Sequence, residues 1–196
     1  SGAAVRLLIL EGQRASMAEY PKHLVQHRVL FDGTQVTIRP IRPEDSGMEQ
    51  EFVRHLSEDS RYYRFMGTLK ELTPKKRKYF TDVDYVRHMA FVATVDRDGS
   101  EVEIGVARYV ATEKGDTCEF AVTVLDEWRR LGLAQRLLDA LIRDARKRGF
   151  RHMTGYILGT NTGMLSLARR MGFVQVPNRD DPTVRVVRRD LAGKLE

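Results

Sequence analysis

The chain has 196 residues, of which 42% are hydrophobic and 31% are charged, and its formal net charge at pH 7 is +6. This composition is that of a globular protein and excludes a wholly disordered chain. No apolar run is long enough to cross a bilayer and no secretory leader pattern is present, so we expect a cytoplasmic protein without a membrane partner.

Cysteine, histidine and basic residues narrow the possible chemistry further. Cys118 is the single cysteine, so the chain cannot form an internal disulfide, as is usual in a reducing compartment. The five histidines lack the spacing of metal ligands, and we expect no metal site. Basic residues are spread along the chain without a nucleic-acid-binding motif, which disfavours nucleic acid as a partner. A solvated basic surface and attraction of a polyanionic small ligand both remain open.

The beginning of the chain is expected to be an appendage that is either packed on the domain or partly mobile. It contains a helix-like stretch that ends at His27. Asp32-Gly33 is a turn signal. After it, residues 35–41 alternate between apolar and polar side chains, which predicts a strand. The predicted organisation is an N-terminal appendage over residues 1–31, one domain over 32–190 and a C-terminal tail over 191–196.

A cluster of short helices is predicted next. Residues 44–56 place apolar side chains at helical spacing. Ser57 is a good N-cap for a second helix that ends near Phe65, and Thr73-Pro74 combines a cap with a proline in the first turn of a third.

Strands follow, and the chain then alternates between helices and strands. Apolar residues recur at helical spacing from Leu133 onward, and Gly149 ends this long helix. The order of elements predicts an α/β (α+β) fold, in which a mixed, mostly antiparallel central sheet carries helices on both faces. Strands are predicted over residues 89–95, 101–111, 118–124 and 152–158, a helix over 162–171, and a final hairpin over 173–176 and 184–187.

The junction between the strand 118–124 and the long helix carries the most informative motif. Small residues at two positions let the backbone approach a ligand closely, and the free N–H groups of a helix start bind phosphate oxygens. Two arginines add charge-assisted donors. The pattern predicts a pyrophosphate cradle, although a bare R-x-x-G-x-A also occurs at plain helix starts. The cradle residues are Arg129, Arg130, Leu131, Gly132, Leu133 and Ala134.

A second motif begins at Asn161 and ends in Gly172-Phe173. Together the two motifs resemble the GNAT superfamily of N-acetyltransferases, over roughly residues 36–189. The resemblance implies the GNAT fold, acetyl-CoA as the acyl donor and direct transfer to an amine. It assigns the CoA pyrophosphate to the cradle, the pantetheine arm to the strand residues Val122, Thr123 and Val124, and a further cofactor contact to Asn161.

A closer likeness is to the Pat-type protein lysine acetyltransferases. It is carried by residues 38–45 (IRPIRPED), 60–65 (SRYYRF) and 118–122 (CEFAV). The resemblance implies a protein substrate with an acceptor lysine, such as an acyl-CoA synthetase. Pat-type proteins often carry a larger fused CoA-ligase-like or cyclic-nucleotide-binding region, which this sequence lacks.

Transfer to lysine needs a base, because a free lysine side chain has a pKa of about 10.4 and is mostly protonated at neutral pH. Glu119 is the candidate, since it stands where the resembling Pat enzymes place their catalytic glutamate; a solvated carboxylate on an edge strand is the alternative. A backbone N–H near Val124 is the expected oxyanion donor. Many GNAT enzymes use a tyrosine as general acid at the position of Ala168. In this chain, either another group or water must protonate the leaving thiolate, or the thiolate leaves unprotonated.

Other reactive side chains favour structural interpretations. An acetyl-cysteine intermediate at Cys118 is disfavoured, because no histidine lies nearby in the sequence to activate the thiol. His88 is interpreted as a structural histidine rather than an acceptor-site residue. Arg61, Tyr62, Tyr63 and Arg64 could form the rim of the acceptor site, but they are interpreted as one face of an amphipathic helix.

Three functions stay open. The first is acetylation of a lysine in another protein, and the second uses the same donor with a small amine as acceptor. The third is a non-catalytic module that senses acetyl-CoA, which Ala168 supports and Glu119 opposes.

Overall fold

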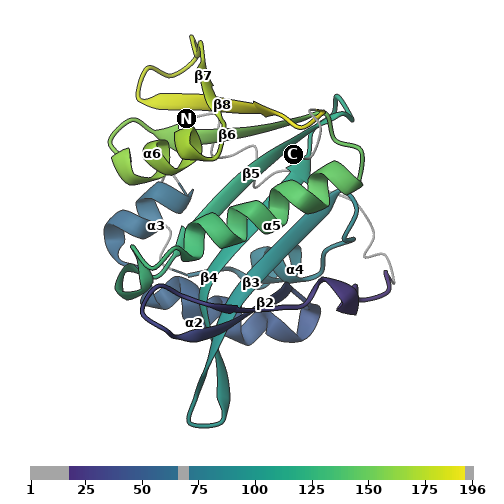
Figure 1. The fold of residues 1–196 in the computed structure, drawn as a ribbon, viewed down its shortest axis with the longest axis vertical. Coiled ribbons are helices and arrows are strands. Elements are labelled where there is room, and N and C mark those ends of the chain that lie inside the picture. Colours follow the sequence, from purple (N-terminus) through teal and green to yellow (C-terminus); the bar gives the residue numbers. More distant parts are fainter. Residues whose placement is uncertain (1–17, 66–70, 193–196) are drawn as a thin grey trace.

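The computed structural model describes residues 18–65 and 71–192; residues 1–17 of the predicted appendage and 193–196 of the predicted tail lie outside this part (Figure 1). Within it, one eight-stranded sheet has the order β1-β2-β3-β4-β5-β6-β8-β7. Strands β5 and β6 run parallel, and the other neighbouring pairs are antiparallel. The strands are β1 (Gln26–Val29), β2 (Gln35–Pro40), β3 (His88–Arg97), β4 (Ser100–Ala111), β5 (Thr117–Val124), β6 (His152–Leu158), β7 (Val174–Val176) and β8 (Val184–Asp190).

Helices cover both faces of this sheet, with α5 in front of it and α2 and α4 behind it in the view of Figure 1. Neighbouring residues of β4 show the two faces, because side chains alternate along a strand. Arg108 reaches Glu49 of α2, with 3.4 Å between Nη2 and Oε1, whereas Tyr109 Oη donates a 2.7 Å hydrogen bond to Asp144 of α5. The predicted fold class is confirmed. The helices are α2 (Ser46–His55), α3 (Glu58–Phe65), α4 (Pro74–Thr81), α5 (Leu133–Lys147) and α6 (Thr162–Arg170).

The long helix α5 forms as its periodicity predicts. Its apolar stripe, which includes Leu137, Leu138 and Leu141, is fully buried against the sheet. Gly149 follows the helix with a φ of +87° and donates its N–H to Arg146 O, so it ends the helix in the left-handed conformation that favours glycine.

The stretch before His27 differs from its prediction. A 3₁₀ turn over Lys22–Leu24 replaces the expected helix, and β1 follows it at the edge of the sheet. The side chains of β1 alternate between half-buried and exposed, and the strand pairs with β2 from Gln26↔Ile38 to Val29↔Gln35. Pairing with a neighbouring strand outweighs the weak helical pattern of so short a segment.

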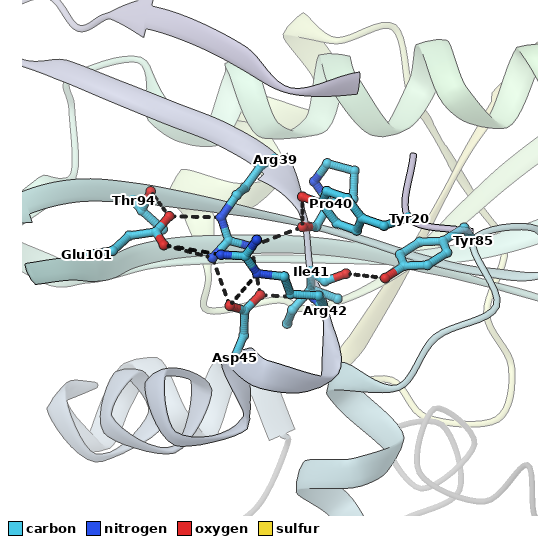
Figure 2. A network of polar contacts seen from close by, with 9 residues as sticks. All are labelled: Tyr20, Arg39, Pro40, Ile41, Arg42, Asp45, Tyr85, Thr94 and Glu101. Carbon is cyan, nitrogen blue, oxygen red and sulfur yellow. Dashed lines mark hydrogen bonds and ion pairs between the residues drawn. The ribbon is translucent and has the colours of Figure 1, made fainter. Parts of the chain in front are cut away.

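The segment 38–45 builds a buried ion cluster between β2 and the start of α2 (Figure 2). Both Nη atoms of Arg39 donate 2.8 Å hydrogen bonds to the carboxylate of Asp45, and its Nε donates another to Glu101 on β4. The Arg39 and Asp45 side chains are 6% and 5% exposed. Tyr85 Oη also donates a hydrogen bond to Ile41 O. In this chain the segment thus fastens α2 to the sheet.

Candidate functional site

The parallel strands β5 and β6 separate partway along their length. Their pairing runs from Thr117↔His152 to Phe120↔Gly155 and goes no further. A cavity of about 680 Å³ opens beyond this point. Its walls come from the ends of β5 and β6, the loop before α5, and parts of α3, α4 and α6. The sheet therefore offers an unpaired strand edge to a ligand.

Gly155 marks the place where the strands separate. The ring of Phe120 lies where a side chain at position 155 would stand, because an added Cβ would lie 2.6 Å from Phe120 Cζ. Phe120 also packs on Phe173, with 4.8 Å between ring centroids, and both rings are buried. A glycine at 155 thus leaves room for this aromatic pair, of which Phe120 lines the cavity.

We expect Gly155→Ala to lower the free energy of unfolding by about 1–3 kcal/mol, because the extra carbon overpacks a buried ring pair. Chemical denaturation measures it. Gly47→Ala in α2 is the matched control, since nothing lies within 4 Å of its added Cβ. That variant should be as stable as the wild type or slightly more so. Equal stability of both variants would show that Phe120 can move aside.

The predicted cradle forms one wall of the cavity. Arg130 and Gly132 have positive φ values of 62° and 82°, which turn the loop sharply into α5 at Leu133. Gly132 is the N-cap residue and has no side chain to bond the first N–H groups of α5, so these groups and the positive end of the helix dipole can meet an anion. Arg129, Arg130, Gly132, Leu133 and Ala134 line the cavity, whereas Leu131 does not.

Arg129 is less free than the sequence suggests. Its Nη2 lies 2.8 Å from Asp126 Oδ1 and donates a 2.7 Å hydrogen bond to Ser60 Oγ of α3. Burial would raise the pKa of Asp126, but hydrogen bonds from Ser57 and Ser60 and the charge of Arg129 lower it. The Arg129 guanidinium therefore ties the loop to α3. Arg130 is exposed and lines the cavity.

The remaining predicted cofactor residues also line the cavity. Val122, Thr123 and Val124 lie on the part of β5 that has separated from β6. Asn161 lines the opposite wall and caps α6, accepting a 3.2 Å hydrogen bond from the N–H of Met164. The fold thus brings all the predicted cofactor residues except Leu131 into the lining of one cavity.

Glu119 lies next to the cavity rather than in its lining. It is half-buried on β5, opposite Val110 on one side and Thr154 on the other. Burial raises the pKa of Tyr79 on α4; the charges of Arg108 and Arg64 oppose this rise and that of Glu119 adds to it. Glu119 therefore interacts with the α4 side of the sheet.

A buried polar cluster, made of Glu49, His88, Glu103 and Arg108, lies on this side and was not predicted. Arg108 Nη1 lies 3.1 Å from His88 Nε2 and donates a 3.0 Å hydrogen bond to Phe80 O. Burial, together with the charges of Arg108 and Arg64, keeps the pKa of His88 well below its usual value. Burial and the neighbouring Glu49 raise the pKa of Glu103 well above its usual value. His88 is buried and does not line the cavity.

Several lining residues come from segments to which the sequence assigned no site role. Phe31 reaches the cavity from the β1–β2 turn, and Phe80 from α4. Tyr63 and Arg64, interpreted from the sequence as structural, line the cavity, whereas Arg61 and Tyr62 do not. No motif marks Phe31 or Phe80, since only the packing of distant segments brings them to the cavity, whereas Tyr63 and Arg64 lie in the segment 60–65.

Cys118 and Ala168 are both fully buried and lie outside the lining. Burial raises the pKa of the Cys118 thiol to about 12. The thiol is thus protonated near neutral pH and poorly suited to act as a nucleophile.

Comparison with known proteins agrees with this geometry. The model of the Acetyltransferase (GNAT) family matches residues 51–173, more than half of the chain. The chain belongs to the GNAT family. It is 42% identical over 154 residues to an acetyltransferase of Pseudomonas aeruginosa, a match that covers 79% of this chain and 83% of that protein.

Solved GNAT structures share the fold. The crystal structure of the GNAT domain of PAT from S. lividans is 30% identical, with a TM-score of 0.80, and the match covers 88% of this chain and 99% of that one. YncA, a putative acetyltransferase from Salmonella typhimurium solved with its cofactor acetyl-CoA, is 18% identical, with a TM-score of 0.65. That match covers 82% of this chain and 96% of that one and shows a common fold.

Two features are absent from residues 18–65 and 71–192. None of the helices in this part of the chain combines the length and the apolar character needed to cross a membrane. The same residues contain no group of three or more His, Cys, Asp or Glu side chains that could hold a metal ion.

Proposed function

We propose that this GNAT protein transfers the acetyl group of acetyl-CoA to the side-chain amine of a lysine in another cytoplasmic protein. One observation supports acetyl-CoA as the donor. The uncapped start of α5 and the unpaired edge of β5 line the same cavity. The similarity to the GNAT domain of PAT, together with the Pat-type segments 38–45, 60–65 and 118–122, supports a protein lysine as the acceptor.

The proposed donor position follows from hydrogen-bonding needs. The pyrophosphate accepts hydrogen bonds from the N–H groups of the loop and first turn of α5, at Arg130 to Ala134, with Arg130 adding positive charge. The pantetheine amides pair with the open edge of β5 at Val122 to Val124, as an added strand would. Asn161 contacts the donor from the opposite wall. The acetyl-CoA that YncA holds supports this choice of donor.

The proposed acceptor approaches from the α3–α4 side, where Glu119 takes the amine proton directly or through a water molecule. The neutral nitrogen attacks the thioester carbonyl carbon, the N–C bond forms, and the backbone N–H near Val124 stabilises the oxyanion. The C–S bond then breaks, the sulfur leaves with the electron pair as the CoA thiolate, and the nitrogen, which is positively charged after the attack, gives its surplus proton to water. Ala168 supplies no proton, so the thiolate leaves unprotonated or takes a proton from water.

A small amine is the second candidate acceptor, and Arg64 favours it. Arg64 lines the cavity on the acceptor side and lies over the rings of Phe65 and Phe80, at 5.0 and 5.5 Å from their centroids. A fixed guanidinium next to an acceptor site suits an amine that also carries a carboxylate or another anionic group.

The test is acetylation of deacetylated lysate proteins from the source cell, with lysines mapped by mass spectrometry and a panel of small amines assayed for CoA release. Specific lysines that gain acetyl groups with wild type support the proposal. Acetylation of small amines alone selects the second candidate. Binding of acetyl-CoA without transfer to any acceptor indicates the non-catalytic sensor.

Gly132→Val is the matched negative control for this test. A β-branched residue at a φ of +82° is strained, and its Cβ would lie 3.0 Å from the ring of Phe31. We expect the loop to shift and the Kd for CoA, measured by calorimetry, to rise about 5- to 30-fold, since a penalty of about 1–2 kcal/mol falls on the binding loop itself. Unchanged CoA binding by a folded Gly132→Val protein would contradict the assignment of the cradle.

A further inference from the structure

The β1–β2 turn presents an exposed aromatic ring at the mouth of the cavity. Phe31 is 75% exposed, more than any other large hydrophobic side chain among residues 18–65 and 71–192, while its neighbour Leu30 is buried. A single exposed hydrophobic residue needs no special explanation. The position of Phe31 does, because this ring lies against the loop that begins α5.

Contacts from both chain segments fix that position. The Phe31 N–H donates a 3.3 Å hydrogen bond to Leu131 O, and Arg136 Nη2 of α5 donates a 2.8 Å hydrogen bond to Val29 O. The ring itself stands beside Gly132, where an added Cβ would lie 3.0 Å from Phe31 Cε2 and Cζ. The turn therefore forms part of the loop structure, and Phe31 lines the same cavity as Arg130 and Gly132.

Hydrogen bonds within the β1–β2 turn fix the backbone that carries Phe31. Leu30 N–H donates to Thr34 O at 2.9 Å, and Gly33 N–H donates to Leu30 O at 3.0 Å. The side chain of Asp32 accepts a further hydrogen bond from the N–H of Thr34. With Leu30 anchored in the core, the ring of Phe31 loses little conformational freedom when a ligand packs on it.

We propose that Phe31 forms an adenine-binding contact, in which its ring stacks on the base of bound CoA. The inference rests on the proposed function, in which the pyrophosphate occupies the N–H groups beside Gly132. The adenosine is bonded directly to that pyrophosphate, so its base lies within reach of the cavity mouth. A purine offers a flat π face, and aromatic side chains bind such faces by stacking without base-specific hydrogen bonds.

The test compares CoA with 4′-phosphopantetheine, which lacks the 3′-phosphoadenosine 5′-phosphate half of CoA and keeps one phosphate of the pyrophosphate. Each ligand is titrated by calorimetry into wild type, Phe31→Ala and Phe31→Trp. We expect Phe31→Ala to raise the Kd for CoA about tenfold, the order that one aromatic–base stack contributes. Its Kd for 4′-phosphopantetheine should not change, and Phe31→Trp should bind CoA at least as tightly as wild type.

Each other outcome overturns the inference. Equal weakening of both ligands by Phe31→Ala would mean that the ring only supports the loop. No weakening of either ligand would mean that the base lies elsewhere; the proposed function would survive, because wild type still binds CoA. A wild-type protein that binds neither ligand would overturn the proposed function together with this inference.

Discussion

Replacing Arg39 by methionine is expected to lower the free energy of unfolding by about 3–5 kcal/mol, the usual result of removing one partner from a buried ion pair. The guanidinium holds two carboxylates, Asp45 and Glu101, and the Asp45 side chain is only 5% exposed. Without Arg39, the buried Asp45 would lose its bidentate partner and keep only the longer ion pair with Arg42, whose Nε lies 3.6 Å from Asp45 Oδ1 (Figure 2). Chemical denaturation of the purified variant measures the loss.

Two further variants separate the charge from its packing. Arg39→Met combined with Asp45→Asn removes both charges and should recover part of the loss, so that the two changes couple in a double-mutant cycle. Arg54→Met is the surface control, since Arg54 and Glu51 also form a short ion pair but are 48% and 57% exposed. Solvent screens that pair, and no measurable change is expected. A loss for Arg39→Met no larger than that of the control would contradict the structural role of the cluster.

The order of the elements could be predicted from the sequence because hydrophobic period and turn residues determine it locally. Leu137, Leu138 and Leu141 repeat at helical spacing, and Gly149 ends α5 as expected. Strand β1 could not be predicted, since four residues carry little periodic signal and only pairing with β2 makes them a strand.

The site was predictable where it follows a continuous segment. Gly132 and the rest of the cradle are consecutive in the sequence, so their common place at the start of α5 follows from the motif. Phe31 and Phe80 reach the same cavity from distant elements, and the sequence carries no signal of that meeting. The Arg108 cluster was missed for the same reason: a charged residue in a strand gives no sign that it will be buried with its partners.

The cavity lining leaves few groups that could act as a base. Among the described residues that line it, there is no aspartate, glutamate or histidine. His88 is buried beside Arg108 and holds a pKa well below its usual value, and Tyr79 holds a raised one because of its burial. Four carboxylates in the described part of the chain stand beside a lining residue in the sequence, and Glu119, directly before Phe120, is the half-buried one; Asp32, Asp59 and Glu127 are exposed.

Glu119→Gln is therefore expected to lower kcat by about 10²–10⁴-fold, the range that a positioned general base contributes, with KM for acetyl-CoA nearly unchanged. The amide keeps the size of the side chain but cannot take the amine proton, and the donor contacts lie on other residues. Steady-state CoA release measures both constants. Glu113→Gln, an exposed change on the same β4–β5 hairpin, should leave them unaltered. Unchanged turnover in Glu119→Gln would remove Glu119 from the mechanism and direct attention to the hydroxyls of Tyr63 and Tyr156, which line the cavity themselves.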